Sequence, residues 1–219
     1  MRLVTLPGVF RPISDTWLLA DALDDEDLKP GARVLDLCSG SGALAVRAAR
    51  RASVTAVDVS RRAVATIRLN ALLNAVEVRA LRGDLFEAVP GERFDAIVCN
   101  PPYVPAPSDD LPARGPARAW DAGRDGRVLL DRICERAPEH LAPGGVLLVV
   151  HSSLLGYART ADRLAAGGLE VDLAAQERGP LGPLMNGRRA HLEAAGMLDP
   201  GQREEDVLVV RGRKRTCAR

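Results

Sequence analysis

Two apolar patterns alternate along the chain. Short runs rich in β-branched residues predict strands, and longer stretches with apolar residues at every third or fourth position predict amphipathic helices. Their regular alternation is typical of parallel strands joined by crossover helices. The expected strands cover residues 33–37, 54–59, 76–81, 94–99, 146–151, 169–174 and 206–211, and the expected helices cover 13–23, 42–49, 61–73, 126–141 and 158–166.

These elements predict an α/β fold built on one doubly wound, mostly parallel sheet of seven strands with helices on both faces. Gly and Pro residues at 29–31, 90–91 and 143–145 each stand before an expected strand, so they indicate turns and not linkers between domains. With 219 residues, 47% of them hydrophobic, the chain can fill one core. We expect a single domain over residues 1–219, with a cap segment over 1–30 and an insertion over 178–204 before the last strand.

Two segments fit neither pattern. Residues 101–124 contain prolines at 101, 102, 105, 107, 112 and 116, and residues 178–204 contain only a short helical pattern over 184–195. The first segment follows an expected strand at its carboxyl end, where open α/β sheets bind ligands. Both segments are therefore predicted to be functional loops.

The charge balance gives no overall field that would hold a polyanion. Thirty Lys and Arg residues oppose 29 Asp and Glu residues, and the formal net charge is +1. The local excess at Arg211, Arg213, Lys214, Arg215 and Arg219 is interpreted as a solvated chain end. The sequence thus carries no strong signal for nucleic acid.

Cysteine and histidine are too scattered to indicate a disulfide framework or a metal site. Cys38, Cys99, Cys134 and Cys217 contain no Cys-x-x-Cys pair, and the three histidines are isolated. No apolar run approaches the ~18 residues of a membrane span, and residues 1–10 lack the features of a secretory signal. We expect a cytoplasmic protein without a metal and without membrane contact.

Residues at the ends of three expected strands predict a nucleoside site. Asp36 precedes a glycine-rich turn, Cys38-Ser39-Gly40-Ser41-Gly42, in which glycine lets the backbone pass close to a ligand. Asp58 stands at the tip of the next strand, where a carboxylate can accept hydrogen bonds from both ribose hydroxyls. Asp84 can accept from an adenine amino group while Leu85 packs on the ring. The glycine turn alone is also compatible with a dinucleotide-binding dehydrogenase.

Asn100-Pro101-Pro102-Tyr103 is the most specific string in the chain. Proline has no backbone N–H, so this corner presents carbonyl oxygens and the Asn100 side-chain oxygen as acceptors. Such a site selects a group with two N–H donors and directs its nitrogen lone pair toward an electrophilic carbon. Tyr103 can cover a flat amide or base, and exclusion of water favours methyl transfer from a sulfonium cofactor. The string predicts methylation of a nitrogen atom.

At these residues the chain resembles the Rossmann-like class I methyltransferases, and within them the short release-factor branch of the HemK family of protein glutamine N5-methyltransferases. The resemblance rests on residues 10–19, 36–42, 58, 84–85, 100–103 and 120–126. It implies an antiparallel last strand, S-adenosylmethionine as cofactor and S-adenosylhomocysteine as product. The positions that it implies for the cofactor are Thr16, Asp36, Cys38, Gly40, Gly42, Asp58, Asp84, Leu85 and Asn100, and those for the reaction are Asn100, Pro101, Pro102 and Tyr103.

The resemblance also implies a protein acceptor with a release-factor-like loop, together with a small activating subunit or a homodimer. The chain departs from the family at two positions. Ser14 stands where the family usually has an acid, and Cys38 stands where it usually has glycine or alanine. Both positions concern the methionine end of the cofactor.

Other acceptors are compatible with the same residues. An exocyclic amine of a nucleic-acid base or a small amino compound would present similar N–H donors to Asn100. A catalytically inactive scaffold that binds S-adenosylmethionine is the non-enzymatic alternative. The surface around Tyr103 separates the acceptors, because nucleic acid requires a basic groove, a protein loop an open cleft and a small molecule a closed pocket.

Overall fold

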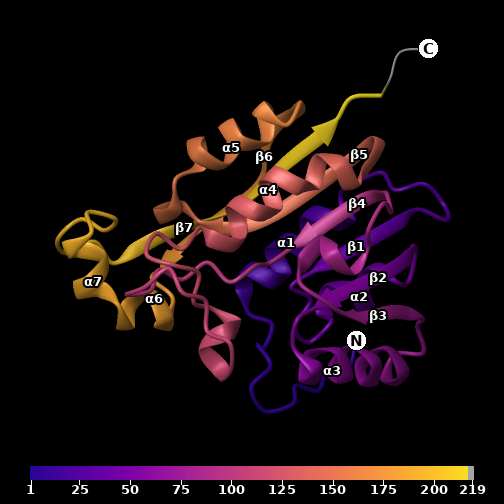
Figure 1. Cartoon of the computed structure of the whole chain (residues 1–219), viewed down its shortest axis with the longest axis horizontal. Helices are drawn as coiled ribbons and strands as arrows, with labels where there is room; N and C mark the ends of the chain where they lie inside the picture. Colours follow the sequence, from indigo (N-terminus) through magenta and orange to yellow (C-terminus); the bar gives the residue numbers. More distant parts are fainter. Residues whose placement is uncertain (217–219) are drawn as a thin grey trace.

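Seven strands form one sheet in the computed structural model, which describes residues 1–216 (Figure 1). The strands lie in the order β3-β2-β1-β4-β5-β7-β6, and β7 runs antiparallel to both of its neighbours. The predicted α/β class, the doubly wound sheet and the antiparallel last strand are confirmed. The strands are β1 (Arg33–Leu37), β2 (Ser53–Asp58), β3 (Val78–Arg82), β4 (Phe94–Cys99), β5 (Leu141–Ser152), β6 (Leu169–Pro180) and β7 (Glu204–Lys214).

Helices cover both faces of the sheet, as Figure 1 shows. Successive strand residues point to opposite faces, so Leu35 packs in a core with α4 and α5 while Val34 packs in a second core with α1, α2 and α3. The short helices α6 and α7 stand between β6 and β7. The helices are α1 (Ser14–Asp24), α2 (Ala43–Ala48), α3 (Arg61–Leu73), α4 (Val128–His140), α5 (Tyr157–Ala166), α6 (Pro183–Gly187) and α7 (Arg189–Ala194), with 3₁₀ turns η1 (Leu85–Ala88), η2 (Pro116–Ala119) and η3 (Ser153–Leu155).

The last strand is longer than the sequence predicts. The interpretation of residues 211–214 as a solvated chain end is wrong, because they belong to β7. Arg211 and Arg213 both pair with Glu26, at 3.0 and 2.8 Å, and the side chain of Glu26 is only 5% exposed. Lys214 donates to the backbone carbonyl of Leu141 at 3.0 Å. Cys217 and Arg219 lie outside the described residues.

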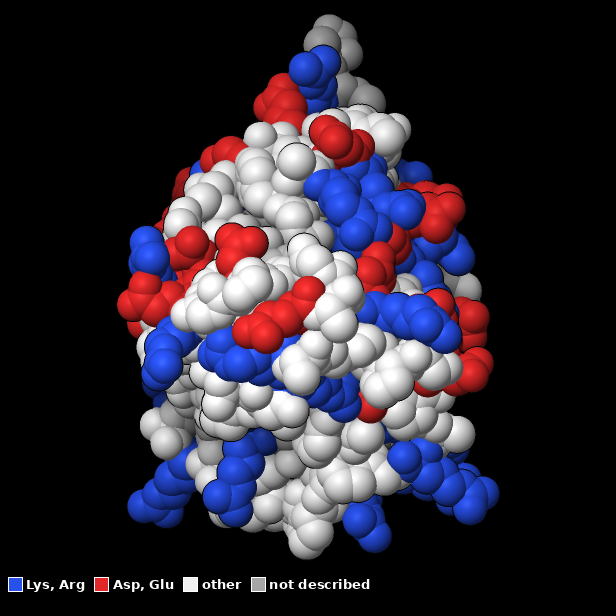
Figure 2. All heavy atoms as spheres, turned by 90° about the vertical axis from the view of Figure 1, so that its left-hand side faces the viewer, with Lys and Arg blue, Asp and Glu red and all other residues white. Residues whose placement is uncertain are grey.

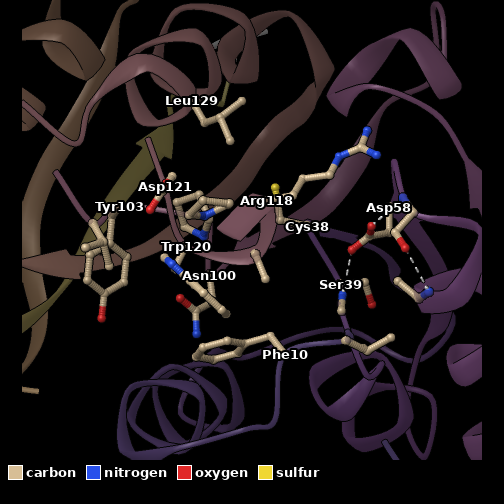
Figure 3. A pocket seen from close by; sticks show the side chains of 18 of the residues that line it. Phe10, Cys38, Ser39, Asp58, Asn100, Tyr103, Arg118, Trp120, Asp121 and Leu129 are labelled. Atoms are coloured by element: carbon tan, nitrogen blue, oxygen red, sulfur yellow. Dashed lines mark hydrogen bonds between the residues drawn. The ribbon is translucent and has the colours of Figure 1, made fainter. Parts of the chain in front are cut away.

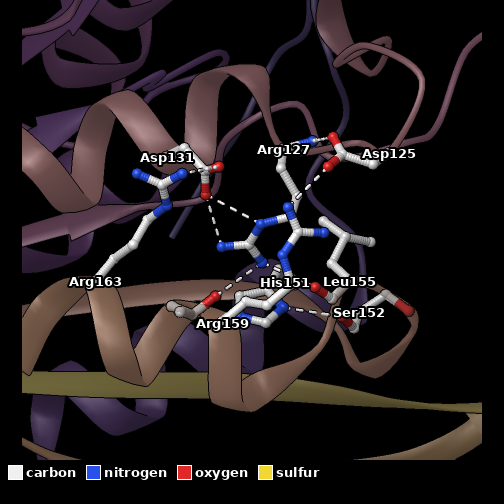
Figure 4. Close-up of polar contacts among 9 residues, drawn as sticks. Asp125, Arg127, Asp131, His151, Ser152, Leu155, Arg159 and Arg163 are labelled. Carbon is white, nitrogen blue, oxygen red and sulfur yellow. Dashed lines mark hydrogen bonds and ion pairs between the residues drawn. The ribbon is translucent and has the colours of Figure 1, made fainter.

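A buried arginine holds the start of α4 against α5 (Figure 4). Arg127 is 1% exposed, and its guanidinium donates to the Asp131 carboxylate at 2.7 Å, the Leu155 carbonyl at 2.8 Å and the Thr160 hydroxyl at 3.1 Å. A buried cation is tolerated when its donors are satisfied in this way. The contacts fix the first turn of α4 relative to the sheet. None of the helices within residues 1–216 is long and apolar enough to cross a membrane.

His151 lies beside this network at the end of β5 and is fully buried. Its Nδ1 lies 2.8 Å from the Ser152 carbonyl oxygen, so Nδ1 carries the proton and Nε2, which has no partner, keeps its lone pair. Burial, together with the nearby Arg127 cation, lowers the pKa of His151 to about 4. The folded state therefore requires the neutral imidazole.

Lowering the pH from 7.5 to 5 should destabilise the protein partly through His151. The unfolded chain takes up a proton near pH 6.5 and the folded chain only near pH 4, so this residue alone should remove about 2 kcal/mol of unfolding free energy. Urea unfolding of wild type and His151→Gln at both pH values measures this contribution. The same pH dependence in both proteins would show that His151 does not titrate in this way.

Candidate active site

A cavity of ≈ 360 Å³ opens where β1, β2, β3 and β4 end. Asp58 lies at one end of it and Tyr103 at the other, with Asn100 and Phe10 between them (Figure 3). Residues 8–10 and 12–13, which precede α1, and residues 182–185 complete the wall. We refer to the two regions as the Asp58 end and the Tyr103 end.

The turn after β1 is held from behind by Asp36. This carboxyl group is fully buried, and its Oδ2 accepts hydrogen bonds from the Ser39 hydroxyl at 2.5 Å and the Ala45 N–H at 3.1 Å. Its Oδ1 is buried without a partner. Burial raises the pKa of Asp36 to about 7. When this buried carboxyl group is ionised, it places a poorly solvated negative charge next to the cavity. A cationic ligand would stabilise that charge.

The backbone of the same turn requires residues that tolerate positive φ. Gly40 and Gly42 have φ of 55° and 78°, and Cys38 adopts 54° although it carries a side chain. A Cβ on Gly42 would lie 3.1 Å from Ile67, so glycine also allows α2 and α3 to approach closely. The turn thereby brings the Gly40 N–H to within 2.9 Å of Asp58 Oδ2.

Asp58 and Asp84 supply carboxylates at the Asp58 end. Asp58 accepts one backbone N–H on each oxygen, from Gly40 and from Ser60 at 2.8 Å, and each oxygen keeps a further lone pair. Burial raises the pKa of Asp58. Asp84 is 42% exposed and pairs with Arg132 at 2.8 Å, while the next residue, Leu85, is 7% exposed and has a φ of 48°.

Asn100 leaves β4 directly into the middle of the cavity. Its Nδ2 donates to the Thr16 hydroxyl at 3.2 Å, which leaves the side-chain oxygen of Asn100 free to accept from a ligand. Thr16 itself is 6% exposed, in the first turn of α1. Asn100 can therefore contact ligands at both ends of the cavity.

The segment after Asn100 is a clamped structure and not a free loop. Val104 N–H donates to the Trp120 carbonyl at 2.8 Å, and the Val104 carbonyl accepts from Ala122 N–H at 3.1 Å. A Cβ on Gly126, whose φ is 72°, would lie 2.4 Å from the Tyr103 carbonyl oxygen. The backbone of Tyr103 is thus fixed by contact with glycine, and its hydroxyl donates to Asp15 Oδ2 at 2.7 Å.

Most of the site residues predicted from the sequence line the cavity, but several other lining residues were not predicted. Asp36 and Gly42 do not line the cavity, because they hold the turn from behind; the other predicted site residues line it. Phe10, Trp120 and Leu129 also line it, as do Arg118 and Glu205. Apolar wall residues have no pattern that separates them from core residues. Within residues 1–216, no group of three or more His, Cys, Asp or Glu side chains could hold a metal ion.

Comparisons with known proteins agree with this geometry. A family model described as methyltransferase small domain matches residues 1–111. The chain is 35% identical to a Methanocaldococcus jannaschii protein named "Putative protein N5-glutamine methyltransferase", over 84% of this chain and 93% of that protein. It is 41% identical to the release factor glutamine methyltransferase of Bordetella pertussis, over 78% of this chain and 68% of that protein. The structure of the E. cuniculi Mtq2-Trm112 complex, responsible for methylation of the eRF1 translation termination factor, matches with a TM-score of 0.65 and 24% identity, over 94% of this chain and 99% of that chain.

The fold and the cavity thus define a class I methyltransferase. The chain belongs to the methyltransferase small domain family, and its relatives place it with the HemK type. The family predicted from the residues is confirmed. A dehydrogenase, which the glycine turn alone would allow, is excluded.

Replacing Gly126 by alanine should disturb the Tyr103 end of the cavity. The new Cβ would clash with the Tyr103 carbonyl, so Gly126→Ala should reduce methyl transfer at least about tenfold and lower stability by more than the ~1 kcal/mol expected from positive φ alone. Gly201→Ala is the matched control, because Gly201 has a φ of 83° and open space at its Cβ. Thermal unfolding and label transfer measure both effects, and equal losses in the two variants would refute the contact.

Proposed function

We propose that this protein transfers a methyl group from S-adenosylmethionine to the side-chain amide nitrogen of a glutamine in a protein. The observation that carries the proposal is the position of Asn100, whose free side-chain oxygen lies between the Asp58 end and the Tyr103 end of one cavity. A residue in that place can hold the acceptor nitrogen next to the cofactor. Positioning of this kind is the main source of rate acceleration when no acid, base or metal is required.

The Asp58 end fits the cofactor. The two Asp58 oxygens, each fixed by one backbone N–H, would accept from the ribose hydroxyls. Asp84 and Leu85 would contact the adenine. Thr16, Cys38, Gly40 and Asn100 would surround the methionine part, and Asp36 and Gly42 would hold the turn. When bound, S-adenosylmethionine supplies an electrophilic methyl group on a sulfonium.

The corner from Asn100 to Tyr103 fits an amide. Pro101 and Pro102 contribute no N–H, so the backbone presents carbonyl oxygens beside the Asn100 side-chain oxygen. An amide –NH₂ held by two such acceptors would face the methyl group with its lone pair, and the Tyr103 ring would cover its plane. Two relatives named for glutamine methylation, at 35% and 41% identity, favour a glutamine amide over other N–H donors.

The surface favours a protein acceptor over nucleic acid. On the end of the molecule that carries α6 and α7, basic and acidic side chains are mixed over most of the area, with basic ones alone along the lower edge (Figure 2). Nucleic acid would call for a continuous basic groove that follows its phosphates. A protein loop requires no such groove.

The expected activating subunit or homodimer stays a prediction. One surface available to a small subunit is the free edge of β3 together with α3, where Leu69, Leu72 and Leu73 are 36%, 77% and 41% exposed. An apolar group of this kind beside an unpaired strand edge suits a protein partner.

The proposal predicts different effects for Asn100 and Asp58. Asn100→Ala should abolish transfer and keep most of the cofactor affinity, because Asn100 holds the acceptor nitrogen. Asp58→Ala should weaken binding of S-adenosylhomocysteine about thirtyfold to a hundredfold, the effect of losing two hydrogen bonds to a carboxylate. Calorimetric titration and single-turnover transfer separate the two. Full turnover in Asn100→Ala would contradict the proposal that Asn100 holds the acceptor nitrogen.

The acceptor can be found by labelling. Wild type and Asn100→Ala are incubated with methyl-labelled S-adenosylmethionine and a cell extract, and the label is separated into protein, nucleic acid and small molecules. Asn100-dependent label in one protein band, mapped to glutamine by mass spectrometry, supports the proposal. Label in nucleic acid or in metabolites would show that the acceptor is not a protein. If the protein binds the cofactor but transfers no label, the result favours a scaffold.

Asp36→Asn should stabilise the protein at pH 8 and weaken cofactor binding. The buried carboxyl group titrates at about 7 in the folded state and at 3.8 in the unfolded state, so its charge should cost about 2 to 4 kcal/mol above pH 7 and little at pH 4. Asparagine keeps an oxygen for the Ala45 N–H but provides no negative charge for a cationic ligand. Urea unfolding at pH 8 tests the predicted gain in stability, and calorimetry tests the predicted loss of cofactor affinity. A variant that is less stable than wild type at pH 8 would contradict the predicted gain.

A further inference from the structure

Two buried carboxyl groups line the Tyr103 end of the cavity, and methyl transfer itself uses neither. Asp15, in the first turn of α1, is 3% exposed, and Glu205, on β7, is 8% exposed. Asp15 Oδ2 accepts from the Tyr103 hydroxyl at 2.7 Å, whereas its Oδ1 is buried without a partner. A buried polar group with unused capacity is costly, so its presence calls for a role.

Glu205 is held in place by neutral donors. Its Oε1 accepts from the Gly182 N–H at 3.0 Å, and its Oε2 accepts from the Ser152 hydroxyl. These contacts keep the carboxylate at the cavity wall without supplying a positive charge. Arg188, between α6 and α7, is itself paired with Asp121 at 2.5 Å.

The stretch between β6 and β7 covers this region with apolar side chains. Leu184 and Met185 line the cavity, and Met185 is 3% exposed. Arg188 fixes the segment by donating to the Pro105 carbonyl and to the Asp121 carboxylate. The Tyr103 end is therefore a low-dielectric space in which charges act more strongly than in water.

The two carboxylates make this space unfavourable for further negative charge. Burial raises the pKa of Tyr103 well above its usual value, and Asp15 and Glu205 raise it further. An anion entering the same space would meet the same repulsion. Neutral groups with N–H donors would not.

We propose that Asp15 and Glu205 make the acceptor site selective for an amide and exclude a carboxylate, so that the protein separates glutamine from glutamate by charge. The inference rests on the proposed function, since it concerns the acceptor of that reaction. Glutamine and glutamate have nearly the same shape, so packing against Leu184 and Tyr103 cannot separate them. Each of the two buried charges should disfavour the carboxylate about tenfold to a hundredfold.

The test measures binding and does not depend on turnover. The probes are two nonapeptides of glycine and alanine, blocked at both ends, that differ only in a central glutamine or glutamate. Their dissociation constants are measured by calorimetry at pH 7.5 with saturating S-adenosylhomocysteine, for wild type, Asp15→Asn and Glu205→Gln. Asp15→Asn can keep the hydrogen bond from the Tyr103 hydroxyl, and Glu205→Gln can keep the one from the Gly182 N–H and donate to the Ser152 hydroxyl oxygen, while each variant removes a charge. Glu177→Gln, which removes an exposed charge on β6, is the matched control.

Wild type should bind the glutamine peptide at least about a hundredfold more tightly than the glutamate peptide, and this ratio should fall about tenfold in Asp15→Asn and in Glu205→Gln but stay unchanged in Glu177→Gln. An unchanged ratio in both pocket variants would overturn the inference, as would a wild-type ratio near one or no binding of the glutamine peptide. If the ratios change as expected but the glutamine peptide is never methylated, the result contradicts the proposed function and supports the selection of glutamine over glutamate by charge. Methylation of the glutamine peptide with unchanged ratios would support the proposed function and overturn the selection.

Discussion

The register of β1 against its two neighbours is the constraint on which the active site depends. Leu37 pairs with Val57 of β2 on one side and with Cys99 of β4 on the other. The next residues, Cys38 and Asn100 just after β1 and β4 and Asp58 at the end of β2, therefore lie at the same level of the sheet. The strand order reverses at β1, and open α/β sheets form their ligand crevice at such a point. A shift of one residue in either pairing would separate the cofactor residues from Asn100.

Elements with strong local signals could be predicted from the sequence, and those that depend on distant contacts could not. Helix α3 was predicted to the residue, since Ser60 caps it through the Ala63 N–H and its apolar positions are regular. The full length of β7 was missed because Glu26, the partner of Arg213, comes from the other end of the chain. Local charge density alone indicated a solvated end.

The candidate site divides in the same way. Asp58, Asn100 and Tyr103 could be found because they occupy set places after strands, where chemistry demands particular residue types. The roles of Asp15 and Glu205 could not be assigned from the sequence. They follow from the burial of both side chains and from their closeness to Tyr103, and no sequence pattern shows either property. The stretch between β6 and β7 was recognised as unusual, yet its contact with the cavity depends on Arg188 reaching the segment after β4.

The cavity is assembled from the chain in two successive portions. The Asp58 end is built largely by residues up to Leu85, with support from Arg118 and Arg132. The Tyr103 end is built largely by residues beyond Asn100, in the clamped segment after β4 and the stretch between β6 and β7. Such a division allows the later portion to diverge without disturbing the earlier one. Descendants of this fold could thus acquire new acceptors by exchanging two surface segments, with one inherited nucleotide platform serving many substrates.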